Sequence, residues 1–152
     1  MPQIPVTTRI ATDRPLVKVD NNAVANPPAG QGFSIIVPVG YRLQPIAIFF
    51  RLTTDANVGA RYLVFDILTS SGILLHFAPN YGIGPTEIRN FVFGPGLANI
   101  NQSATVLDST TPTCPGLTLQ EGDEIRVALT GIQVGDQFSL INTQVLSQFV
   151  AE

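Results

Sequence analysis

The hydrophobic positions of this chain recur mostly with a period of two, which predicts strands rather than helices. The clearest case is the segment 124–130, in which Ile125, Val127 and Leu129 alternate with more polar neighbours. Such alternation is typical of an antiparallel strand with one face in a core and the other in solvent. No stretch of ten or more residues carries a sustained 3.6-residue period, so we expect little helix.

Turn signals divide the chain from Phe33 onward into roughly eight or nine short strands. Clusters of Gly, Pro, Asn and Asp separate the hydrophobic segments, for example at 55–59, 70–72 and 94–96. Many short strands in one domain of this length are typical of two packed sheets. We therefore predict an all-β fold, a two-sheet antiparallel sandwich that is jelly-roll-like, over residues 31–152.

Residues 1–30 differ from the rest and are expected to form an extended N-terminal arm and a connector. The segment 1–9 contains prolines and β-branched residues without a sustained period, and 26–32 is Pro- and Gly-rich. Between them we expect a short strand at 16–19, ended by Asp-Asn-Asn at 20–22. The arm either docks on a neighbouring molecule or is a plain disordered terminus. The residues expected to dock are Ile4, Pro5, Val6 and Arg9.

Charged residues make up only 12% of the chain and hydrophobic residues 45%, whereas a typical soluble domain carries about 25% charged residues. A membrane helix does not explain this, because the longest apolar run, at 45–50, is far shorter than the roughly 20 residues required. Contact with other protein molecules explains the shortage of charge, because charged residues are depleted at the cores of protein interfaces. The net charge is −3 and no basic stripe is present, so we expect neither nucleic acid nor membrane as a partner.

Within the predicted strand 41–54 the segment 45–50 is apolar on both faces, and within the predicted strand 60–69 the segment 62–68 nearly is. In a two-layer fold the outer face of such a strand needs cover, and each covered side chain contributes roughly 1.5–3 kcal/mol. The chain's own loops or arm are one possible cover. We favour a second copy of the chain and expect a homotrimer. The residues expected at this subunit interface are Ile46, Ile48, Phe50, Arg61, Tyr62 and Val64.

Arg61 is expected to have a structural or interface role because it opens a strand directly after a turn. It lies on the same face of that strand as Leu63 and Phe65. This position favours a side chain whose stem packs on apolar groups and whose guanidinium binds a carboxylate or turn carbonyls. Asp55 in the turn and a carboxylate of a neighbouring subunit are the two candidate partners.

The chain offers little for catalysis or metal binding. His76 is the only histidine and lies in a predicted strand, and Cys114 is the only cysteine and lies in a turn-like loop. A nucleophile triad and a cupin-type metal centre both need more than these residues supply. The segments 20–22 and 55–57 carry oxygen ligands of the kind that calcium uses, but turn formation explains them better. We expect no enzymatic activity, no cofactor and no small-molecule ligand.

Two segments resemble small structural proteins of tailed bacteriophages. Residues 53–61 read Thr-Thr-x-x-x-Val-Gly-x-Arg before a hydrophobic strand, and 121–127 read Glu-Gly-Asp-Glu-Ile-Arg-Val. The resemblance covers 39–73 and 117–152. It implies a virion component, and capsid cement or decoration proteins, which are typically trimeric β-rich modules with extended termini, fit the size.

The resemblance implies that the partners are other copies of this chain and the major capsid protein. It places the protein on the outer capsid surface after synthesis in the host cytoplasm. The alternative is a trimeric receptor- or glycan-binding tip of a phage fibre, which should show an exposed aromatic groove around Tyr41 or Tyr81. A hydrolase would instead need two carboxylates within about 5–10 Å in a cleft.

Overall fold

The computed structural model describes residues 17–78, 82–95, 100–101, 107–109 and 117–150. These residues contain strands and turns and no helix. The strands are β1 (Val17–Ala23), β2 (Phe33–Ile36), β3 (Tyr41–Thr53), β4 (Tyr62–Thr69), β5 (Gly72–Phe77), β6 (Ile88–Phe93), β7 (Ile100–Asn101), β8 (Leu107–Ser109), β9 (Glu124–Thr130) and β10 (Gln137–Phe149).

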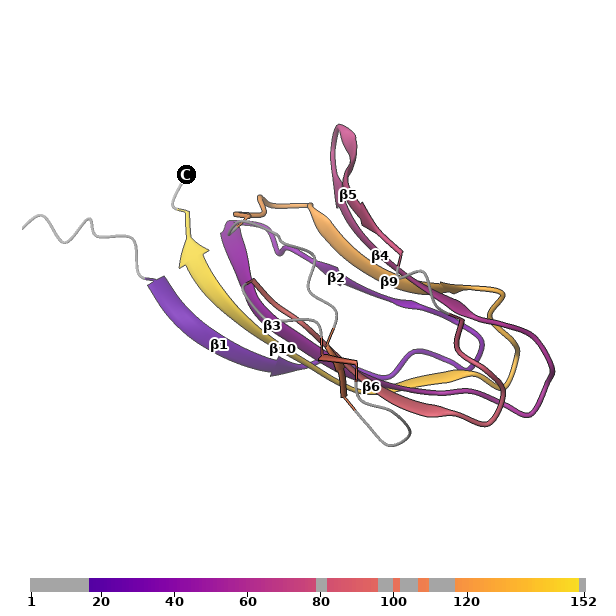
Figure 1. The fold of residues 1–152 in the computed structure, drawn as a ribbon. Helices are drawn as coiled ribbons and strands as arrows, with labels where there is room; N and C mark the ends of the chain where they lie inside the picture. Colours follow the sequence, from indigo (N-terminus) through magenta and orange to yellow (C-terminus); the bar gives the residue numbers. More distant parts are fainter. Residues whose placement is uncertain (1–16, 79–81, 96–99, 102–106, 110–116, 151–152) are drawn as a thin grey trace, which may run out of the picture.

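The strands form two sheets that lie face to face (Figure 1). The larger sheet has the order β1-β10-β3-β6-β8-β7, and the smaller sheet has the order β2-β9-β4-β5. The pairs are antiparallel, with the exception of β6 and β8. The order β1-β10-β3-β6 against β2-β9-β4-β5 is that of an eight-stranded jelly roll. The predicted fold class is therefore confirmed.

The core between the sheets is rich in phenylalanine. The Phe50 ring of β3 lies 5.1–5.7 Å, centroid to centroid, from the rings of Phe33, Phe91, Phe93 and Phe138. Aromatic pairs at such distances contribute about 0.5–1.5 kcal/mol each beyond the area they bury. Because Phe33 belongs to the smaller sheet and the others to the larger one, this cluster joins the two layers.

A bulge in β3 lies within the unbroken apolar run 45–50. The pairing of β10 with β3 skips Ile46, which is half-buried. An extra residue shifts the alternation of a strand, so Pro45 and Ile48, three residues apart, both face the core. Proline has no N–H to donate and is tolerated at such an irregular position. Phe49 is left on the outer face of the larger sheet.

The first described strand is longer than predicted. Residues 20–22 do not end it, because every residue of β1 pairs with β10. The Asp20 carboxylate accepts a hydrogen bond from the Ser147 hydroxyl of β10, which accommodates an acidic residue within the strand. Residues 17–23 of the predicted arm are thus the edge strand of the larger sheet. The expected docking residues Ile4, Pro5, Val6 and Arg9 lie outside the described residues.

Candidate functional site

Arg61 is fully buried at one end of the sandwich, and every N–H of its guanidinium has an acceptor. Nε donates to Asp136 Oδ2 at 3.0 Å, and Nη2 donates to Asp55 Oδ1 at 2.5 Å and to Asp136 Oδ1 at 3.2 Å. Nη1 donates to the carbonyls of Asn57 at 2.9 Å and Gly59 at 2.7 Å. The predicted contacts with Asp55 and the turn carbonyls are confirmed. The second carboxylate belongs to the same chain.

Asp136 is the buried centre of this ionic cluster. Its carboxylate also accepts hydrogen bonds from the backbone N–H groups of Gln133 at 2.7 Å and Asp55 at 2.9 Å. Burial alone would raise the pKa of Asp136, but the hydrogen bonds from Arg61 and from the two N–H groups lower it below its ordinary value. The cluster therefore joins the β3–β4 turn to the β9–β10 turn. Although Asp55 and Asp136 converge, Arg61 lies between them, so they do not form an open hydrolytic pair.

A row of polar side chains crosses the outer face of the smaller sheet. Asp66 of β4 lies in its middle, where Oδ1 is 2.6 Å from His76 Nδ1 and Oδ2 accepts a hydrogen bond from Arg126 Nη2 at 2.6 Å. The strand register aligns Arg126 with both Asp66 and Ser34. At the far end of the row the Ser34 hydroxyl donates to Glu124. We call these five side chains the polar row.

The polar row has a partial resemblance to a catalytic triad, which the contacts do not support. Burial raises the pKa of Asp66, but hydrogen bonds from Arg126 and His76 lower it overall, so the carboxylate is ionised. An Asp–His pair needs a nucleophile at the other ring nitrogen, and within the described part of the chain no hydroxyl or thiol is hydrogen-bonded to His76. The predicted role of His76 as a hydrogen-bonded strand residue is confirmed.

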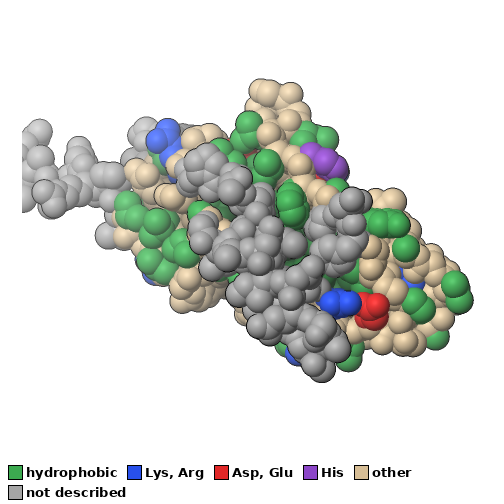
Figure 2. Space-filling model, viewed as in Figure 1, with side chains coloured by type: hydrophobic (Ala, Val, Ile, Leu, Met, Phe, Trp, Pro, Cys, Tyr) green, Lys and Arg blue, Asp and Glu red, His purple; other side chains and the backbone are tan. Residues whose placement is uncertain are grey.

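Exposed apolar residues lie beside the polar row, towards the β4–β5 hairpin. Ile36, Ile73 and Leu74 are 61%, 59% and 55% exposed, and Ile73 pairs with Leu68, which is half-buried. We call these four residues the hairpin patch. In Figure 1 the hairpin extends beyond the rest of the sandwich. Figure 2 shows hydrophobic side chains in green around it and few charged side chains on the face in view.

Five of the six residues predicted at a subunit interface separate into two groups, and the sixth, Ile46, is the half-buried bulge residue of β3. Ile48 and Phe50 lie in the core and Arg61 lies in the ionic cluster, so the chain itself covers all three. This corrects their assignment to a subunit interface. Ile48, Phe50 and Leu52 alternate regularly along β3, and the face that they share is the core face. Tyr62, which is 42% exposed, and the half-buried Val64 lie on the outer face of the smaller sheet, across the polar row from the hairpin patch.

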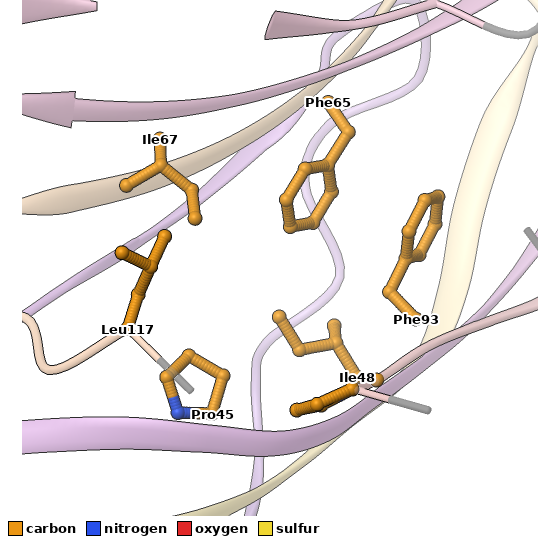
Figure 3. Close-up of a pocket in the computed structure, with 8 residues that line it drawn as sticks. Pro45, Ile48, Phe65, Ile67, Phe93 and Leu117 are labelled. Atoms are coloured by element: carbon orange, nitrogen blue, oxygen red, sulfur yellow. The ribbon is translucent and has the colours of Figure 1, made fainter. Parts of the chain in front are cut away.

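A small apolar pocket opens between the two sheets. Its lining side chains approach one another from both layers in Figure 3. They are Pro45, Ile48, Phe65, Ile67, Phe93, Gly94, Pro95 and Leu117. Its volume of about 40 Å³ leaves space for little more than one water molecule, and a lining without polar side chains gives a water no partners. This pocket is a packing gap of the core.

Sequence reasoning missed Asp136 and the partnership of Asp66 with Arg126. A carboxylate in the middle of a hydrophobic strand is the signal that marks Asp66, whereas Asp136 resembles an ordinary turn residue. Tyr81 lies outside the described residues, so the predicted aromatic groove around it is not described. The Tyr41 ring packs edge-on against the Phe149 ring, with the centroids 5.6 Å apart.

The described residues contain no group of three or more metal-ligating side chains placed to hold an ion. None of their segments is a helix long and apolar enough to cross a membrane. Comparison of the chain with protein-family models, curated protein sequences and solved structures gave no significant match.

Proposed function

We propose that the chain is a structural protein of a virus particle, a self-associating module of the capsid cement or decoration type. The observation that carries the proposal is the outer face of the smaller sheet. There the hairpin patch and the polar row form a surface in which apolar side chains are exposed and the central ionic groups already have partners.

The hairpin patch has the properties of a protein contact. Full cover of an aliphatic side chain contributes roughly 1.5–3 kcal/mol, and three residues of the patch are more than half exposed. Since Asp66 is bonded to both His76 and Arg126, a partner that covers this face does not leave the carboxylate unpaired. Leu68, Ile73 and Leu74 adjoin at the hairpin, and Ile36 lies across Glu124 from Leu68. Exposed apolar residues that gather in this way mark interaction sites.

The edge strand β5 adds a second reason to expect association. It pairs with β4 on one side and has no described neighbour on the other. An exposed edge presents unpaired N–H and C=O groups, and natural proteins protect such edges with lysine, proline or a covering segment. The sequence of β5, Gly-Ile-Leu-Leu-His-Phe, contains neither lysine nor proline. A second copy of the chain therefore fits at this edge.

The jelly roll is compatible with the proposal but does not decide it. Double-sheet jelly rolls occur in viral capsid proteins, in lectins and in cupins, and a fold alone does not identify a function. The resemblance to phage structural proteins adds a second line of support. Its Thr-Thr-x-x-x-Val-Gly-x-Arg segment is the turn that Arg61 holds in place, so this motif has a physical role in the chain.

Light scattering on the purified chain and two surface variants tests this proposal. The wild-type chain should have a mass that is a multiple of 16.3 kDa, three times that value for a trimer. Ile73→Asp combined with Leu74→Asp should shift the mass towards the monomer. Ile88→Asp is the matched control, because Ile88 is exposed to a similar extent but belongs to the larger sheet. A wild-type monomer at every concentration would contradict the proposal.

A further inference from the structure

A depression lies on the outer face of the larger sheet, on the side of the sandwich away from the hairpin patch. It spans the neighbouring strands β1, β10 and β3. Its volume of about 480 Å³ is within the range of roughly 300–1,000 Å³ that ligand sites occupy. The lining residues are Asn21, Asn22, Ala23, Ala47, Phe49, Asn142, Thr143 and Gln144.

The strand register produces this depression from two neighbouring rows of side chains. In one row Ala23 and Phe49 flank Asn142, and in the next row Asn21 and Ala47 flank Gln144. The two alanines therefore lie at opposite ends of neighbouring rows. Small side chains at these positions leave space between the larger ones, so the depression follows from sequence and register together.

The polar side chains that line the depression are neutral. They are four amides and the Thr143 hydroxyl, which donates to the Asn22 carbonyl at 3.3 Å. Each side-chain amide carries both a donor and an acceptor. Asn142 Nδ2 donates to the Leu140 carbonyl at 3.1 Å, which leaves its Oδ1 available. Among the described residues nothing is hydrogen-bonded to the side-chain amides of Asn21 and Gln144. The depression thus offers donors and acceptors beside the partly exposed ring of Phe49.

This chemistry excludes several classes of ligand. No arginine or lysine lines the depression to pair with a phosphate, and no carboxylate lines it to bind a divalent cation. A peptide strand cannot add to the sheet here, because β10 is already paired on both sides by β1 and β3. What fits is a neutral ligand whose hydroxyl groups both donate and accept hydrogen bonds and which has an apolar face for the Phe49 ring.

We propose that this depression binds a neutral carbohydrate. The hydroxyl groups of a pyranose match the amides of Asn21, Asn142 and Gln144, and the C–H face of the sugar ring packs on Phe49. The site does not depend on the proposed structural function, because it lies on the other sheet and its ligand does not need the hairpin patch. A surface protein with both sites would bind its own copies through one sheet and a glycan through the other.

Nuclear magnetic resonance titration of the full chain tests the proposal, with maltose, cellobiose and lactose as the probes at millimolar concentrations. At least one disaccharide should shift the side-chain amide signals of Asn142 and Gln144. Ala23→Leu fills the depression from an exposed position and should abolish the shifts. Gln144→Ala removes one amide and should weaken binding about tenfold, the effect of a lost interaction of about 1.4 kcal/mol.

Gln148→Ala is the matched control, because Gln148 is an amide on the same face of β10 but outside the depression. It should leave the affinity unchanged. Thermal melting of each variant checks that the fold is intact. If no disaccharide shifts these signals, or if Ala23→Leu binds as well as the wild type, the proposal is wrong. Binding of inorganic phosphate at the same residues would also contradict it, since the site would then not select neutral ligands.

Discussion

Removal of the Arg61 guanidinium is the perturbation whose effect is most clearly defined by the structure. Arg61→Ala deletes the five hydrogen bonds that the guanidinium donates. It leaves the Asp136 carboxylate, which has no exposed surface, without its counter-charge. Breaking a buried pair by removal of one partner costs about 3–5 kcal/mol. Since a domain is stable by about 5–15 kcal/mol, this loss is a large part of the total.

Urea unfolding followed by circular dichroism measures this effect. The midpoint should fall markedly in Arg61→Ala while the slope of free energy against urea stays the same, because the surface exposed on unfolding is unchanged. Arg61→Lys should also be destabilised, because an ammonium group cannot reproduce the two-pronged contact with Asp136. Lys18→Ala is the control; it removes an exposed ion pair with Asp20 and should have little effect.

A double variant separates the loss of attraction from the penalty of a buried unpaired charge. Arg61→Leu with Asp136→Leu removes both charges and should be less destabilised than Arg61→Leu alone. If Arg61→Ala lowers the free energy of unfolding by less than about 1 kcal/mol, as for an exposed pair, the cluster does not stabilise the turns in the way described.

Three further outcomes are expected. Because the pKa of Asp136 is lowered in the folded chain, its contribution to stability is complete above the ordinary pKa of 3.8. This contribution is lost as the pH falls through the pKa of the folded state. Urea midpoints measured on acidification should therefore fall less steeply in Asp136→Asn than in the wild type. His76→Gln should barely change the thermal midpoint, because the ring is 57% exposed and glutamine can still donate to Asp66; a large fall would contradict this. Deletion of residues 1–15 should leave the thermal midpoint nearly unchanged, because the prolines at 2 and 5 and the absence of a sustained period predict an arm that buries little of its own surface. If the proposed function is correct, the deletion should abolish attachment to the capsid. A truncated chain that is unfolded would refute this.

The fold class was predictable from the sequence because alternation is a local property. Ile125, Val127 and Leu129 alternate with polar residues, and all three are buried in β9. The exact faces of β3 were not predictable, because the bulge at Ile46 depends on the pairing with β10. Both faces of the run 45–50 carry apolar residues, so the sequence alone does not show that the face shared by Ile48 and Phe50 is the core face.

The candidate sites were predictable only where the partners are neighbours in the chain. Asp55 is close to Arg61 in sequence, and the turn between them indicated the contact. Asp136 is 75 residues away from Arg61, and nothing local distinguishes it from other turn aspartates. The amides of Asn21 and Gln144 meet through the register of β1 and β10, which no single segment of the sequence reveals.

Electron cryomicroscopy of virus particles from cells that make this chain tests the proposed capsid function most directly. If the proposed function is correct, density for the jelly roll should lie on the outer surface of the capsid, with the copies in contact through the β4–β5 hairpin and the hairpin patch. Particles in which the chain is absent from the capsid surface, or in which Ile73 and Leu74 face solvent in isolated copies, would contradict it.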